Sequence, residues 1–199
     1  LLSLSLAGDI LKRAPNCSIE CDARLLPILE RSFPSARIVP RCNPPDPKTK
    51  SADLVCPALS AARFLRQSFD DFPRHHGYLK ADPDKIGEIR ERYLSLAQGR
   101  KIVGLSWGSA SRSGRLKTPP LEIWKTLLQN DAFFFVSLQY TGAKEDAETL
   151  FNLSGTHVFV ESEIDPTSDI DLTAAQISAL DAVVTISNSS AHLAGALGC

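Results

Sequence analysis

The sequence has no methionine, no long hydrophobic run and almost no net charge, and each absence excludes a class of protein. With 22 Lys and Arg against 23 Asp and Glu, the formal charge is −1, which gives no reason to expect nucleic acid or an acidic membrane as a partner. No apolar stretch approaches the roughly 20 residues that span a bilayer. Residues 1–6 are apolar but lack the basic flank and cleavage site of a signal peptide. We therefore expect a globular, cytoplasmic protein without a transmembrane segment.

The five cysteines form neither a disulfide framework nor a metal-binding pattern. Cys17 and Cys21 share a predicted strand, where four residues span about 13 Å, too far for a disulfide. The other three are scattered. The fingerprints G-x-G-x-x-G and G-x-x-x-x-G-K-[ST] are also absent. Reduced thiols and no metal site are the expectation.

The lack of methionine even at position 1 indicates a piece of a longer chain. Residues 1–13 have the pattern of a helix tail, and Cys199 follows a predicted helix with no further strand. We therefore expect the sheets at both ends of the sequence to be truncated.

The sequence does contain a repeated alternation of short apolar runs with amphipathic helices. Such alternation predicts the α/β class, with parallel sheets covered on both faces. Strands are predicted at 17–21, 36–40, 52–56, 102–107, 132–138, 156–160 and 183–186. Helices are predicted at 1–13, 22–29, 60–67, 82–97, 118–130, 143–153, 172–180 and 190–197.

The alternation divides into two parts. Residues 68–81 lack periodicity, and Asp82 followed by Pro83 is the pattern of a capped helix start. We predict a parallel-sheet domain at 1–80, a linker helix at 81–100 and a second parallel-sheet domain at 101–199.

The strongest functional pattern lies between Asp181 and Gly198. Its strand, which we expect to be buried on both faces, ends at Ser187–Ser190 and a helix of small residues. Unpaired N–H groups and the positive end of the helix dipole favour an anion there. His192 in the first turn is a candidate donor to a phosphate or a sugar hydroxyl. Most junctions of this kind between a strand and a helix bind no ligand. The alternative is therefore that the segment only caps the helix and that His192 has no binding role.

A basic loop follows the strand that ends at Trp107, and it carries Arg112, Arg115 and Lys117. Ligands of parallel sheets bind outside the carboxyl ends of the strands. The loop and the helix N–H groups would together suit a diphosphate. A solvated basic loop is the alternative, and we expect Trp107 to be a core residue.

An ordered set of segments resembles family 9 (heptosyltransferase-like) glycosyltransferases, closest to the version at the carboxyl end of bacterial tetratricopeptide-repeat proteins. The segments similar to the donor half are Lys101–Trp107, Arg115–Lys117, Phe135–Gln139 and His192–Gly198. Those similar to the acceptor half are Ile19–Asp22, Arg31–Pro34 and Phe72–Tyr78. The resemblance covers most of the chain in the expected order.

The resemblance implies a GT-B architecture, in which two Rossmann-like domains flank a cleft and the second binds a nucleotide-sugar. It implies that the donor is bound by Lys117, Arg115, His192 and the backbone of Asn188, Ser189 and Ser190. An acidic residue after Gly142, either Glu145 or Asp146, would hold the donor ribose. The general base is expected on a glycine-rich loop upstream of Leu1, so Asp9 is not assigned as catalytic.

The function implied is metal-independent, inverting transfer of a sugar from a nucleoside-diphosphate donor to an acceptor hydroxyl on a glycan, lipid-linked or protein molecule. No cofactor besides the donor is expected, and we expect the 199 residues alone to be inactive. One alternative is a non-catalytic nucleotide-sugar-binding or scaffold module of a repeat protein, because the family often has Asp-Thr where this chain has Ser187-Asn188. Another is a different GT-B enzyme, such as a sugar-nucleotide epimerase.

Overall fold

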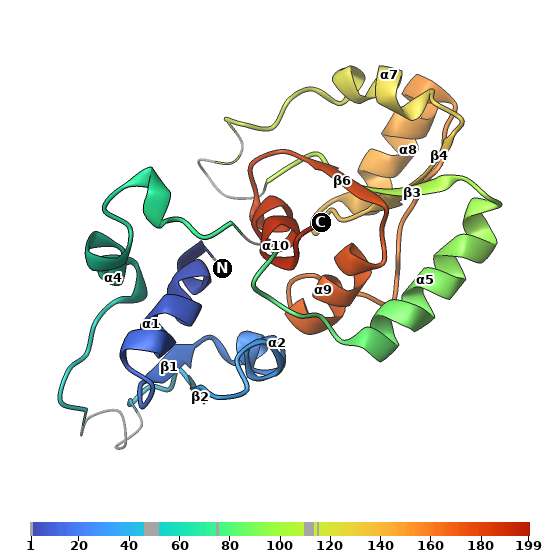
Figure 1. The fold of residues 1–199 in the computed structure, drawn as a ribbon. Helices are drawn as coiled ribbons and strands as arrows, with labels where there is room; N and C mark the ends of the chain where they lie inside the picture. The colour runs from blue at the N-terminus through green and yellow to red at the C-terminus, as the bar shows by residue number, and fades with distance from the viewer. Residues whose placement is uncertain (1, 46–51, 75, 110–113, 115) are drawn as a thin grey trace. The chain divides into compact units, whose positions relative to one another are not determined.

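The α/β class predicted from the alternation is confirmed in a computed structural model, which describes residues 2–45, 52–74, 76–109, 114 and 116–199. Two parallel sheets form, one of two strands in the order β1-β2 and one of four strands in the order β5-β4-β3-β6. The described chain groups into two compact units, Leu1–Lys80 with Ala196–Gly198, and Ala81–Gly195 with Cys199. Figure 1 traces both units from the N-terminus to the C-terminus.

The first unit contains a short parallel pair, β1 (Ser18–Cys21) and β2 (Arg37–Pro40), in which Ile19 lies opposite Ile38. Its helical segments are η1 (Leu2–Leu6), α1 (Ala7–Arg13), η2 (Ala23–Leu25), α2 (Leu26–Ser32), α4 (Ala58–Leu65) and η3 (Phe69–Asp71). As expected, Asp22 caps the first turn after β1 by accepting from the Arg24 N–H at 3.0 Å. Asp9 lies in α1, where its carboxylate pairs with the buried guanidinium of Arg66.

The predicted strand at 52–56 is wrong, because no strand is present in the described residues 52–57. Leu54 and Val55 are 84% and 78% exposed. β-Branched and apolar residues favour a strand only where a neighbouring strand supplies the hydrogen bonds and an apolar face covers the side chains. Neither condition is met in the described part of this segment.

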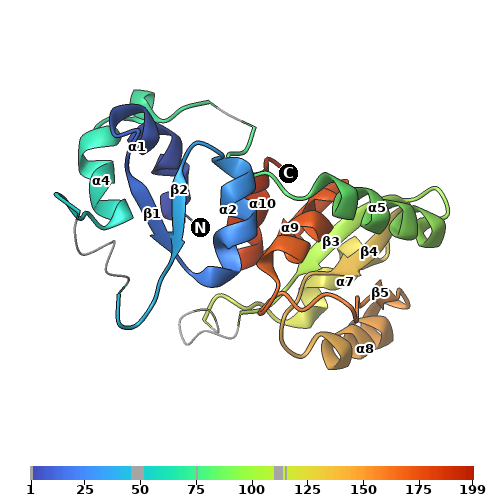
Figure 2. The ribbon, with the colours of Figure 1, turned by 90° about the horizontal axis from the view of Figure 1, so that it is seen from below.

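The second unit is a three-layer α/β arrangement. Its strands are β3 (Lys101–Ser106), β4 (Phe133–Ser137), β5 (Val158–Phe159) and β6 (Ala182–Thr185). Its helices are α5 (Pro83–Ala97), η4 (Leu121–Trp124), α7 (Lys125–Leu128), α8 (Ala143–Ser154), α9 (Ile170–Ser178) and α10 (Ser189–Leu197). Helices α7 and α8 lie on one side of the sheet, and α5 and α9 lie on the other (Figure 2).

Alternate residues of β3 face the two helical layers. Val103, Leu105 and the indole of Trp107 enter a core that also contains Trp124 and Leu150. Trp107 and Trp124 are 1% and 7% exposed, which confirms that Trp107 is a core residue. On the other face, a Cβ added at Gly104 would come within 2.4 Å of Leu180 Cδ1, so a larger residue here would require the Leu180 side chain to move.

Helix α5 begins where the sequence predicts, since the Asp82 carboxylate accepts from the backbone N–H groups of Asp84 and Lys85. The helix groups with the second unit and packs on α9. There the fully buried Tyr93 hydroxyl accepts a 2.9 Å hydrogen bond from Gln176 Nε2. Burial raises the pKa of Tyr93 to about 12, so the phenol stays neutral in this interface.

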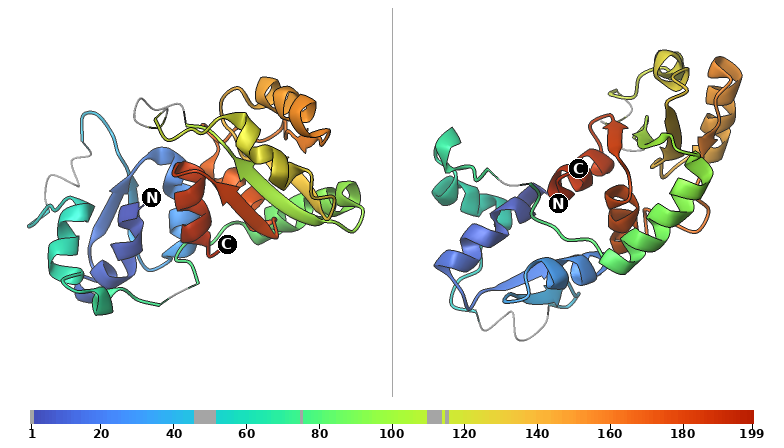
Figure 3. Two further views of the ribbon diagram at one scale, coloured as in Figure 1. Left: turned by 90° about the horizontal axis from the view of Figure 1, so that it is seen from above. Right: turned by 45° about the vertical axis from the view of Figure 1, so that its right-hand side comes forward.

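Two sequence expectations in this unit need correction. The helix predicted from Thr118 starts only at Leu121, because each of Pro119 and Pro120 holds the residue before it out of the helical region. The last strand was expected to be buried on both faces, but β6 is an edge strand of the described sheet and Val184 is 38% exposed. Figure 3 shows β6, in red, beside the green β3.

Asp181 links β3, β6 and α5 at the end of the sheet where the strands begin. Its carboxylate accepts from the Ile102 N–H at 2.7 Å and from Arg90 Nη2 at 2.8 Å. Partial burial acts to raise the pKa of Asp181, but the hydrogen bonds from Arg90 and Ile102 outweigh it and leave the pKa below the ordinary value of 3.8. The charged carboxylate therefore stabilises the folded state.

We expect Asp181→Asn to lower the free energy of unfolding by about 1–3 kcal/mol at neutral pH, because hydrogen bonds to a charged group are lost. A folded-state pKa below the unfolded one gives stability that is complete above about pH 5 and is lost as the pH falls through the folded-state pKa. Urea unfolding at several pH values would check this. The difference between the two proteins must shrink in acid; a constant difference would contradict the assignment.

Candidate functional site

Polar side chains collect where β3, β4 and β6 end, here called the carboxyl edge of the second sheet. The three strands are parallel neighbours, with Leu105 paired to Ser137 in β4 and to Val184 in β6. Most buried side chains of the described chain are apolar, yet five buried polar residues belong to this edge. They are Ser106, Ser137, Gln139, Asn188 and Ser190. Buried polar atoms require partners, so the hydrogen bonds here define the geometry of the site.

Asn188 connects the start of α10 to the loop after β3. Its Oδ1 accepts from the backbone N–H groups of Ser190 at 3.0 Å and Ala191 at 3.3 Å, which is the geometry of a helix N-cap. Its Nδ2 donates to Ser106 Oγ at 2.7 Å and to the Gly108 carbonyl at 3.2 Å. The side chain is therefore fully engaged, and it contributes no negative charge.

Gln139 binds the same loop from the side of β4. Its Oε1 accepts from the Gly108 N–H at 3.0 Å and from Ser106 Oγ at 3.3 Å, while its Nε2 donates to the Thr141 carbonyl at 3.4 Å. The N–H and C=O of Gly108 are thus held by two different side-chain amides. A Cβ at Gly108 would lie 3.1 Å from Gln139 Nε2, so the loop approaches this amide closely.

The N-terminus of α10 keeps the features that the sequence predicts for an anion site. Its first turn contains no acidic residue. The Ser190 N–H, predicted as a phosphate donor, instead donates to Asn188. Within the described chain, the backbone N–H groups of Asn188 and Ser189 have no hydrogen-bond acceptor, and Ser189 is exposed. These two donors and the helix dipole remain available at the carboxyl edge.

Lys117 lies on the loop that leaves β3 at this same edge, and its side chain is exposed. Its N–H donates to the Gly114 carbonyl at 2.9 Å. Next to it, Thr118 Oγ1 accepts from the Ser109 N–H at 3.2 Å. The two ends of the loop are thus joined beside Lys117. The predicted Arg112 and Arg115 lie outside the described residues.

The two acidic candidates after Gly142 differ in their surroundings. Gly142 has a φ of +65° and precedes α8, a left-handed position that favours glycine. Asp146 is half-buried, and its Oδ2 accepts from the indole Nε1 of Trp107 at 2.8 Å. Glu145 is exposed, and no hydrogen bond or ion pair of its carboxylate is present in the described structure. The geometry therefore favours Asp146 as the oriented carboxylate of this edge.

His192 is exposed in the first turn of α10, and its N–H donates to the Asn188 carbonyl at 3.4 Å. With Lys117, Ser189 and Asp146 it belongs to the loops and helix starts that follow β3, β4 and β6. The roles of Ser106 and Gln139 were missed. Both are polar residues at the end of an apolar strand, which could have indicated a role in the site. The sequence does not show, however, with which loop each side chain forms hydrogen bonds.

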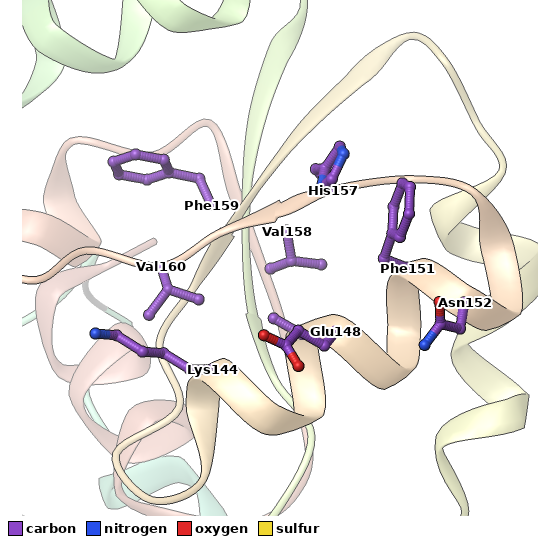
Figure 4. A pocket seen from close by; sticks show the side chains of 9 residues that line it. Lys144, Glu148, Phe151, Asn152, His157, Val158, Phe159 and Val160 are labelled. Carbon is purple, nitrogen blue, oxygen red and sulfur yellow. The ribbon is translucent and has the colours of Figure 1, made fainter.

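A separate open pocket of about 630 Å³ runs along α8 and β5. Figure 4 shows Lys144 and Glu148 on its helical side, and Phe151 close to His157. The Phe151 and His157 rings stack with centroids 4.0 Å apart. None of the predicted donor-binding residues that the structure describes lines this pocket.

No group of three or more His, Cys, Asp or Glu side chains in the described ranges is arranged to hold a metal ion. Likewise, none of the described helices has both the length and the apolar character needed to cross a membrane. The cysteines among the described residues are all free thiols.

The two units with their parallel sheets match a GT-B-like fold. The structure of E. coli ADP-heptose LPS heptosyltransferase II shares it, with a TM-score of 0.64 and 15% sequence identity, and the match covers 98% of this chain and 78% of the other. At that identity the similarity establishes the fold alone.

A second comparison concerns sequence. Protein FlbA of Caulobacter vibrioides is 28% identical over 196 aligned positions, and the match covers 91% of this chain and 32% of FlbA. The chain therefore spans about a third of the length of this curated relative. No protein-family profile matches the sequence.

Proposed function

We propose that the second unit binds a nucleoside-diphosphate sugar and that the protein transfers the sugar to an acceptor hydroxyl. The observation that carries the proposal is the meeting of an α10 N-terminus without acidic residues and the Lys117 loop at one sheet edge. A diphosphate needs donors and positive charge, and the edge offers both. The similarity of the fold to a heptosyltransferase supports the same class of reaction.

The chemistry that we infer is an inverting displacement at the anomeric carbon. The acceptor hydroxyl oxygen bonds to that carbon from the opposite face and gives its proton to a general base, while the bond to the donor phosphate oxygen breaks and charge develops on the leaving diphosphate. The Asn188 and Ser189 N–H groups, the α10 dipole and the Lys117 ammonium would stabilise this charge without a metal or a cofactor. His192 would donate to a phosphate or sugar oxygen. The acceptor hydroxyl would belong to a glycan, a lipid-linked sugar or a protein. The transferase itself would be part of a bacterial tetratricopeptide-repeat protein.

Asp146 would bind the donor ribose. A carboxylate accepts from two vicinal hydroxyls, and the Trp107 indole holds one carboxylate oxygen of Asp146 in place. The carboxylate follows β4, whereas the proposed phosphate donors follow β3 and β6. This separation keeps its negative charge on a different loop from the phosphate groups.

A non-catalytic nucleotide-sugar-binding module is the second candidate. The observation in its favour is Ser187, an exposed neutral residue where the resembling family often has Asp. Screening several nucleotide sugars for binding, for donor hydrolysis and for transfer would separate the two. Binding with turnover supports the transferase, binding without turnover supports the module, and absence of binding excludes both.

We expect Lys117→Ala to weaken the binding of a nucleoside diphosphate by about 1–3 kcal/mol, because a charge-assisted contact is lost. Isothermal titration calorimetry with ADP and UDP would measure it. Lys101→Ala is the matched control, since Lys101 is exposed at the opposite end of the same strand and the charge change is equal. Equal affinities for the two variants would contradict the assignment of Lys117.

We expect Asp146→Asn to weaken ADP binding by about 1–3 kcal/mol while leaving pyrophosphate binding unweakened, because pyrophosphate has no ribose. The new amide oxygen can still accept from Trp107, so the local structure is kept. Glu145→Gln, one residue away, should leave both affinities unchanged. A loss with Glu145→Gln instead would move the ribose contact to Glu145.

A further inference from the structure

We propose that Asn188 is a positioning residue, whose neutral amide sets the Lys117 loop against the N-terminus of α10. The proposal rests on the proposed function, since it concerns the same anion site. It begins from two side-chain amides that bind the backbone of Gly108: Asn188 donates to its C=O, and Gln139 accepts from its N–H.

Backbone groups fix the orientation of both amides. The Ser190 and Ala191 N–H groups can only donate, so the Asn188 atom that they contact must be Oδ1. The other atom, Nδ2, must therefore point at Ser106 and Gly108. The Gly108 N–H likewise fixes the contacted atom of Gln139 as Oε1.

The Ser106 hydroxyl links the two amides in a series of hydrogen bonds that all donate in the same direction, from Asn188 to Ser106 to Gln139. Its oxygen accepts from Asn188 Nδ2 at 2.7 Å, and its proton is directed to Gln139 Oε1 at 3.3 Å. Hydrogen bonds therefore run from the β6 exit, through the end of β3, to the β4 exit. The three side chains are at most 7% exposed, so water does not offer a ready substitute for a lost bond.

This series of hydrogen bonds reaches Lys117 through the contact between Ser109 and Thr118, which joins the two ends of the loop. Gly108 is clamped, the next residue Ser109 donates its N–H to Thr118 Oγ1, and Thr118 is the neighbour of Lys117. Asn188 therefore holds both proposed halves of the anion site, the helix N-terminus through Oδ1 and the lysine loop through Nδ2.

Only a neutral amide meets all of these demands. A carboxylate at this position would still accept from Ser190 and Ala191, but an oxygen would face the Gly108 carbonyl oxygen at about the present 3.2 Å. The carboxylate would also put a negative charge at the N-terminus of α10. That end of the helix attracts anions, so the added charge would oppose their binding. A threonine hydroxyl can cap the helix but is too short to bond the loop as well.

The main test is a double-mutant cycle with ADP affinity as the readout. Lys117→Ala is measured in the wild-type chain and in Asn188→Thr, which keeps a cap but loses the bridge to Gly108. We expect Lys117→Ala to lower ADP affinity by about tenfold in the wild type and by less than about threefold in the variant. Lys101→Ala should have the same small effect in both. An equal loss from Lys117→Ala in both backgrounds overturns the proposal and leaves the proposed function standing.

Asn188→Asp gives a second test if the threonine variant does not fold. At low ionic strength it should bind ADP about tenfold or more weakly, since like charges a few ångströms apart repel. The loss should shrink in about 1 M salt, and adenosine affinity should not change. Unchanged ADP affinity, or an equal loss for adenosine, overturns the proposal. A wild-type chain that binds neither ADP nor UDP overturns the proposed function and this inference together.

Discussion

The backbone N–H and C=O of Gly108, each bonded by a different side-chain amide, are the constraint on which the rest of the carboxyl edge depends. A loop that passes between two strand exits buries an N–H and a C=O, and both need partners that water cannot supply. Gln139 satisfies the first and Asn188 the second. Because Asn188 also caps α10, the path of the loop and the position of the helix are determined by one side chain.

The electrostatics of the edge follow from that choice of residue. An asparagine cap satisfies helix N–H groups without neutralising the helix dipole, whereas an aspartate cap would oppose any bound anion. The nearby carboxylate of Asp146 is turned toward the Trp107 indole, on the loop after β4. The free helix N–H groups and the Asp146 carboxylate therefore follow different strands of one sheet.

The fold and the site are under different physical constraints, and the comparisons reflect this. The layers are held by apolar side chains such as Leu105, Phe135 and Leu150, which many sequences can replace at similar volume. A TM-score of 0.64 at 15% identity to a heptosyltransferase is compatible with that tolerance. The edge instead depends on particular donors and acceptors, so the proposed function depends on those few residues rather than on the layers.

The sequence alone determined most of the local elements and predicted where an anion would bind. Asp82 before Pro83, the glycine at 142 and the apolar run at 133–137 each specify their element through near-neighbour contacts. Only the tertiary structure decided which polar groups meet, since Asn188 and Gly108 are 80 residues apart. It also decided that 52–56 is not a strand and that β6 lies at an edge of the described sheet. Strand pairing and burial depend on distant residues, and no pattern within the strand itself records them.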